Sequence, residues 1–204
     1  MNVATDLSVR SKRLQSATHS AHERLDTRIM AADPFADRER YVRFVKVQHA
    51  FHRDLAALYG DATLAALLPD LAGRQRLSQI EDDLGDLGAA VPRYDIAPHF
   101  GGHGDVPTAL GWLYVAEGSN LGAAFLLKEA EKLGLDEMFG ARHLAAAPEG
   151  RGAHWRSFTA ALDAVTLSEE DEQRAIAGAT AAFTRVAALV DAHLAVSETA
   201  AAAV

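Results

Sequence analysis

The stretch ALGWLYVAEGSNLGAAF, residues 109–125, is the most informative part of this chain for its fold. Good helix formers continue without a proline on both sides of Gly118, which predicts one long helix. At 100° per residue, Gly111, Gly118 and Gly122 lie within about 40° of one another. Tyr114 and Phe125 border the same face. The segment therefore predicts a helix with a flat, glycine-lined side.

Three glycines on one helical face call for a physical reason, because each costs about 1 kcal/mol relative to alanine in a helix interior. One explanation is tight packing, in which another helix approaches the backbone. The other is a flat ligand that lies against the backbone, or a bend in the helix. The spacing alone leaves these explanations open.

The rest of the chain has the same helical character. Its proline-free stretches are rich in Ala, Leu, Glu, Arg and Gln, and no run alternates apolar and polar residues as a half-buried strand would. Ser168, followed by three acids, predicts the start of the last helix. We expect an all-α, single-domain, multi-helix bundle over residues 1–204, with about 1–6 and 197–204 frayed. The expected helices cover roughly 7–31, 38–59, 62–68, 74–87, 107–135, 153–166 and 168–196, and residues 89–105 form a loop.

Composition excludes several classes of function. The chain has 204 residues with 20 basic and 28 acidic side chains, a net charge of −8, which argues against a nucleic-acid partner. It has no cysteine, which excludes disulfides, thiolate metal ligands and cysteine nucleophiles. No apolar run approaches the ~18 residues of a membrane span, and no secretory signal is visible at the start. We therefore expect a cytoplasmic protein whose metal ligands are histidines or carboxylates.

Two histidines lie on the first predicted helix. Leu14 and Leu25 mark its apolar stripe. His22 falls about 80° from Leu14, at the edge of that stripe, whereas His19 falls about 140° away on the wetter side. We expect His22 to face inward, where a neutral imidazole could bind a metal ion. A buried histidine bonded to a backbone carbonyl is the alternative, and periodicity favours it.

A second pair of histidines lies on the next predicted helix. His49 and His52 are spaced i, i+3, which can suit a metal ion, and His52 falls on the inward side with Tyr41. No carboxylate stands three or four residues away on the same side. We therefore interpret both histidines as structural.

Two segments together resemble a known family. Residues 14–22, LQSATHSAH, resemble the first-helix signature of haem oxygenases, in which a threonine precedes the proximal haem-ligand histidine by four residues. Residues 111–125 resemble the distal helix of the bacterial haem oxygenases of the iron-acquisition and phytochrome-associated branch. Residues 135–144, LDEMFGARHL, and 155–158, WRSF, also look like that branch. The resemblance covers the chain from about residue 14 to about residue 194.

The resemblance implies a site as well as a fold. Haem b would lie between the first helix and the glycine-rich helix, with His22 as the proximal ligand of the iron. Gly118 and Gly122 would take part in catalysis, because they let the helix backbone lie close over the ring. The residues of this helix that would contact haem are Tyr114, Gly118, Ser119, Gly122 and Phe125.

The resemblance also implies a reaction, in which haem is both substrate and oxygen-activating cofactor. With O2 and electrons it would be cleaved to biliverdin, carbon monoxide and ferrous iron. The chain has no nucleotide-binding fingerprint, so the electrons would come from a ferredoxin or a flavin reductase. A basic face for that donor could come from Arg10, Lys12 and Arg13. We expect a monomer.

The chain departs from some members of the family at two points. Ser119 stands where the animal enzymes have an aspartate that holds distal water, so other groups must order such water here. Some bacterial members clamp the haem propionates with lysines and cut a different meso carbon. No evident lysine pair is present, and Tyr114 could bond a propionate, so we expect mainly the α-meso product.

Other functions occur on related helical architectures. Thiaminase-type chemistry needs a cysteine nucleophile, and the chain has none. Di-iron carboxylate oxidases need Glu-x-x-His pairs, and none occurs. A non-enzymatic haem carrier or sensor with the same fold remains the alternative to the enzyme.

Overall fold

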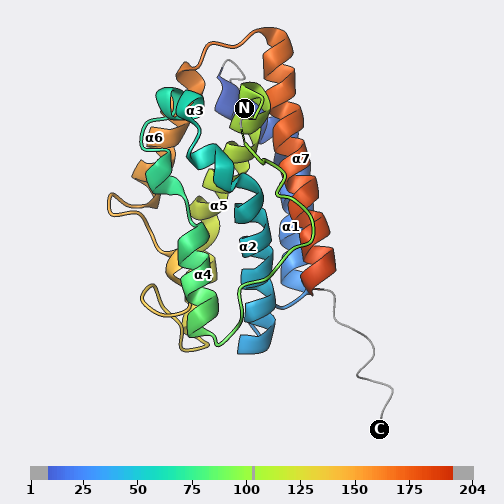
Figure 1. The fold of residues 1–204 in the computed structure, drawn as a ribbon, viewed down its shortest axis with the longest axis vertical. Coiled ribbons are helices and arrows are strands. Elements are labelled where there is room, and N and C mark those ends of the chain that lie inside the picture. Colours follow the sequence, from blue (N-terminus) through green and yellow to red (C-terminus); the bar gives the residue numbers. More distant parts are fainter. Residues whose placement is uncertain (1–8, 103, 195–204) are drawn as a thin grey trace, which may run out of the picture.

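The computed structural model describes residues 9–102 and 104–194. These residues form an all-helical bundle without a β-strand, as the sequence predicts (Figure 1). The frayed ends expected at 1–6 and 197–204 lie outside the described residues. The α-helices are α1 (Arg10–Ala31), α2 (Arg38–Tyr59), α3 (Ala62–Leu67), α4 (Leu77–Asp86), α5 (Val106–Glu131), α6 (Arg151–Ala164) and α7 (Glu169–Leu194), and two 3-10 helices are η1 (Ala72–Arg74) and η2 (Arg142–Leu144).

Local signals place most helix ends. Ser168 Oγ accepts a hydrogen bond from the Asp171 amide at 3.1 Å, which confirms the start predicted for α7. The main difference is at the end of α5, where the prediction ran to about residue 135 and the helix stops at Glu131. Gly134 adopts a φ of 73°, a left-handed conformation that turns the chain out of the helix.

The long helix α7 organises the bundle. It packs most extensively along α5, then along α1 and α2, and Figure 1 shows it running the length of the molecule. By length and composition alone, α7 is long and apolar enough to cross a membrane. Its apolar residues, however, include buried ones such as Phe183 and Val190. A core helix of a soluble protein passes the same test, so this finding is weak evidence for a membrane.

The crossing of α5 and α7 explains one of the three glycines. A Cβ atom at Gly111 would overlap the carbonyl oxygen of Ala175 on α7. The reverse holds for Gly178 on α7, where a Cβ would overlap the carbonyl oxygen of Thr108 on α5. Gly111 therefore belongs to a helix–helix contact, which is the first of the two explanations that the spacing left open.

The start of α1 is fixed by a buried arginine. Arg10 is 4% exposed and its guanidinium donates to the carbonyl oxygens of Leu162 and Val165 at the end of α6. It also forms an ion pair with Glu172 of α7 at 2.7 Å. These contacts remove Arg10 from the basic surface on which the sequence analysis placed it.

Both histidines of α2 are buried, at 3% exposure each. Burial and, to a smaller extent, the neighbouring His143 together lower the pKa of His52 to about 3, so His52 is neutral at physiological pH. His49 lies 3.1 Å from the Tyr94 hydroxyl and 3.4 Å from a Glu81 carboxylate oxygen. These surroundings agree with the structural interpretation of this pair.

Candidate functional site

The structure places His22 at the edge of α1 and not inside the core. Its side chain is 59% exposed, and its Nε2 lies 3.5 Å from Asp26 Oδ2. The buried stripe of α1 is taken by Leu14, Thr18 and Leu25, which leaves His22 just outside it. The inward orientation expected for His22 is therefore wrong, and its imidazole is accessible from solvent.

One wall beside His22 is formed by α7. The ring of Phe183 meets the imidazole edge-on, with 5.8 Å between the ring centroids and 75° between the planes. This ring contact places His22 beside α7, the helix on which α1 and α5 both pack. His19, which is 68% exposed and lies 3.4 Å from Glu23, points outward as predicted.

The open side of α5 carries the other two glycines. A Cβ at Gly122 would meet nothing within 4 Å, and one at Gly118 would make an ordinary contact of 3.6 Å with the ring of Trp155. Leu121 and Phe125 are exposed on the same helix. The three glycines therefore have different surroundings. Gly111 packs on α7, Gly118 lies against the ring of Trp155, and Gly122 faces open space.

These features suit a flat apolar ligand that brings its own metal. Met30 on α1 is an exposed large apolar residue, as are Leu121 and Phe125 on α5, and such side chains commonly mark a binding surface. Within residues 9–102 and 104–194, no group of three or more His, Asp or Glu could hold a bare ion. A haem iron needs only an axial side chain because the macrocycle supplies four nitrogens. The accessible imidazole of His22 fits that requirement.

Tyr114 adds a polar group to α5. Burial raises the pKa of its phenol to about 12, with a smaller contribution from the Asp163 carboxylate. The phenol is therefore protonated at neutral pH and can donate a hydrogen bond. Ser119 is exposed, but its hydroxyl already donates to the Ala116 carbonyl at 2.7 Å, one turn back along the helix.

Behind Gly118 lies a buried ion pair that sequence reasoning missed. Glu117 Oε2 accepts from Arg74 of η1 at 2.9 Å, and the two side chains are 1% and 2% exposed. Burial raises the pKa of Glu117, while the charge and hydrogen bond of Arg74 oppose that shift. A signal was present, because Glu117 is the lone acid in the apolar stretch 109–125. Its partner, 43 residues away, could not be read from spacing.

Comparisons with known proteins decide the family. The model of the Heme oxygenase family matches residues 8–192. The chain belongs to the haem oxygenase family. It is 45% identical to Heme oxygenase PigA of Pseudomonas aeruginosa over 188 residues, which cover 92% of this chain and 94% of that protein. It also resembles the crystal structure of the NO- and CO-bound heme oxygenase of Neisseria meningitidis, with a TM-score of 0.87, 40% identity and coverage of 93% and 94%.

These findings confirm the resemblance to bacterial haem oxygenases and the all-α fold class. A solved relative at 40% identity over nearly the whole chain shares the bundle described above. The family is one of haem-degrading enzymes, so this haem oxygenase is an enzyme that cleaves haem to biliverdin.

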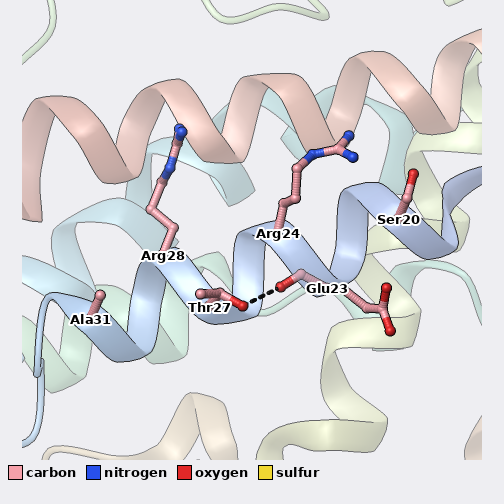
Figure 2. Close-up of a pocket in the computed structure, with 6 residues that line it drawn as sticks. All are labelled: Ser20, Glu23, Arg24, Thr27, Arg28 and Ala31. Carbon is pink, nitrogen blue, oxygen red and sulfur yellow. Dashed lines mark hydrogen bonds between the residues drawn. The ribbon is translucent and has the colours of Figure 1, made fainter.

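One hollow on the surface of this haem oxygenase is separate from the site. Figure 2 shows that its lining residues all come from α1, and that Arg24 and Arg28 reach from them towards α7. Thr27 Oγ1 donates to the Glu23 carbonyl at 2.8 Å in this hollow. Neither His22 nor α5 contributes to it. The residues that line it are Ser20, Glu23, Arg24, Thr27, Arg28 and Ala31.

Proposed function

We propose that this haem oxygenase binds haem b between α1 and α5, with His22 as the iron ligand and Gly118 and Gly122 against the opposite face of the ring. The proposal is carried by an accessible imidazole on α1 and an open position at Gly122 on α5, two helices that touch each other. Both elements belong to a chain whose family degrades haem.

Each proposed contact has a physical role. His22 holds the substrate at a single position, and its Asp26 neighbour can accept from the imidazole only after a small rearrangement, since the 3.5 Å separation is long for a hydrogen bond. Exposed Leu121 and Phe125 offer apolar surface that excludes water from the ring. When bound, haem supplies the iron that activates O2 and the meso carbon that is oxidised.

Tyr114 is proposed to orient the substrate. Its phenol keeps its proton at neutral pH, because its pKa is raised to about 12. A protonated phenol can donate to a haem propionate, and a hydrogen bond to a charged acceptor is stronger than one between neutral groups. Ser119, whose hydroxyl donates to the helix backbone, keeps an oxygen that can still accept a bond on this side.

The experiment that tests this function uses the purified chain with hemin. Binding alone should give a histidine-ligated absorbance spectrum. Adding a reductant and O2 should remove the Soret band and release biliverdin, carbon monoxide and ferrous iron. A haem carrier or sensor of the same fold would keep its Soret band, and that outcome would contradict the oxygenase. Identity of 45% to a protein named as an oxygenase favours turnover.

The electron donor is proposed to be a ferredoxin or a flavin reductase that docks on the outer surface of α1. We further propose a cytoplasmic monomer without a membrane or nucleic-acid partner. Arg10 is buried and Arg13 pairs with Glu169 at 3.3 Å, so the basic surface shifts from the residues first expected. Lys12 and Arg24 are exposed on α1. Both residues lie on α1, the helix that carries His22.

Reversing one charge on α1 should weaken the reaction with a protein donor. Arg24→Glu is expected to slow reduction by an acidic donor about 10-fold at low salt, because charge complementarity sets the association rate. The loss should shrink as salt is added. Stopped-flow reduction of the haem complex measures it. The control is Arg93→Glu, which makes the same charge change at an exposed residue of the loop between α4 and α5. Equal slowing by both variants, or slowing with a small reductant, would contradict the docking surface.

The main biliverdin isomer is predicted to be the α form. Tyr114 is the propionate donor proposed on α5, and the end of α1 carries Met30 where a lysine clamp would need a cation. Lys128 on α5 is exposed, but the last turn of α1 has no lysine that could act with it. Chromatography of the products tests the prediction directly. A predominance of the β or δ isomer would overturn it.

A further inference from the structure

The turn of α5 that contains Gly118 is held from behind by two arginines. The first is Arg74, which forms the buried ion pair with Glu117. The same guanidinium reaches the His154 carbonyl of α6 at 3.4 Å and lies over the ring of Phe158, 5.6 Å from its centroid. Arg74 thus joins η1, α5 and α6 at one point, directly behind the open side of α5.

The second arginine, on α6, contacts α5 three residues beyond Glu117. Arg151, the first residue of α6, donates to the Asn120 carbonyl at 2.9 Å and also to the Leu144 carbonyl. One turn later on α6, Trp155 contacts the position of Gly118. Figure 1 shows α6 beside α5, in agreement with their contacts. Residues 117, 118 and 120 of α5 are therefore all held from η1 or α6.

Stability alone is a weak reason for this arrangement. A buried ion pair is often no more stabilising than apolar residues of the same size, because both charges lose their hydration. Here the pair is also incompletely satisfied, since Glu117 Oε1 and Arg74 Nε find no hydrogen-bond partner among the described residues. Gly118 and Gly122, by contrast, make this part of α5 easy to bend. Contacts from η1 and α6 can hold the backbone of such a segment in one conformation.

We propose that Arg74 and Arg151 are positioning residues for haem cleavage, which fix the backbone of residues 117–122 over the ring through the Glu117 carboxylate and the Asn120 carbonyl. This inference rests on the proposed placement of haem against Gly118 and Gly122. A fixed backbone sets the space above the iron. That space governs how a small ligand sits there and which edge of the ring it approaches.

The test compares four variants of the holoenzyme, of which Arg151→Lys is the conservative one. Arg151→Met keeps the apolar stem and removes the donors to Asn120. The pair of changes Arg74→Met with Glu117→Leu removes both buried charges together, so that no unpaired charge is left in the interior. Arg185→Gln is the matched control, because it breaks a contact of 2.7 Å to the buried Asp54 carboxylate between α7 and α2, away from this turn.

Four quantities are measured: the melting temperature of the apoprotein, the haem affinity, the rate of CO dissociation from the ferrous complex and the isomer ratio of the product. Haem affinity and the histidine-ligated spectrum should stay within about 3-fold of wild type, since α1 is unchanged. CO dissociation should become at least about 5-fold faster and the isomers should be mixed, because small displacements at a reacting centre have large effects. Arg151→Lys keeps one positively charged nitrogen that can donate to the Asn120 carbonyl. It should restore much of the wild-type CO dissociation rate and of the wild-type isomer ratio.

The result that overturns the proposal is specific. It is a wild-type CO rate and isomer ratio in Arg151→Met and in the double variant, with only the melting temperature changed, as in Arg185→Gln. A wild-type chain that binds haem but does not cleave it would contradict the proposed function instead. The CO rates would still test the two arginines in that case.

Discussion

His22→Ala should abolish the histidine-ligated haem spectrum while the helical fold stays intact. The side chain is 59% exposed and its ring meets that of Phe183 at the surface, so removing it leaves no internal cavity. The stability of the apoprotein should change by less than about 0.5–1 kcal/mol, as for other surface substitutions. Absorbance of the hemin complex and the rate of biliverdin formation measure the effect on the site.

A buried histidine supplies the contrast. His52→Ala removes a side chain that is 3% exposed in the core of α2, and it should destabilise the apoprotein by about 1–3 kcal/mol. The effect of His52→Ala on the haem spectrum should be smaller than that of His22→Ala. Added imidazole should partly restore the spectrum of His22→Ala, because the ligand can enter from solvent. A normal histidine-ligated spectrum and normal turnover in His22→Ala would show that another residue binds the iron.

Helix positions could be predicted from the sequence because they depend on neighbours along the chain. The expected and observed helices agree within about four residues at their ends, and proline and glycine account for most of the breaks between them. The direction of His22 was not predictable in the same way. A helical wheel places a residue relative to the apolar stripe, but how far the neighbouring helices cover that stripe is a property of the packed bundle.

Partners distant in the chain explain what the sequence analysis missed. From the sequence alone, Arg10 is expected to be a surface charge. In the folded bundle it is buried by the end of α6 and by Glu172 of α7. Glu117 stands out in an apolar helix, but nothing in its neighbourhood along the chain identifies Arg74. The two explanations for the glycines apply to different residues. Gly111 packs against α7, and the ligand explanation stays a prediction for Gly118 and Gly122. Only the crossing of α5 with α7 separates Gly111 from Gly118 and Gly122.

That separation predicts opposite results for the same substitution at two glycines of α5. Gly111→Leu should prevent stable folding, because its Cβ would overlap backbone atoms of α7 that have no room to move. Overpacking in a core usually costs about 1–3 kcal/mol and more where neighbours cannot give way. Gly122→Leu meets nothing within 4 Å, and removing a helical glycine should raise the stability of the apoprotein by up to about 1 kcal/mol.

The same Gly122→Leu variant should lose biliverdin formation, since its side chain would occupy the space proposed for haem. The stability of Gly118→Leu should lie between those of Gly111→Leu and Gly122→Leu, because the ring of Trp155 lies 3.6 Å from the Cβ position of residue 118. Melting temperature of the apoprotein and turnover per folded molecule are the two measurements. Gly85→Leu is the matched control: Gly85 also lies in a helix with nothing within 4 Å, but on α4. It should gain stability and keep its turnover. Normal turnover in Gly122→Leu would place the haem elsewhere, because a leucine at that position and a ring against the backbone cannot share the same space.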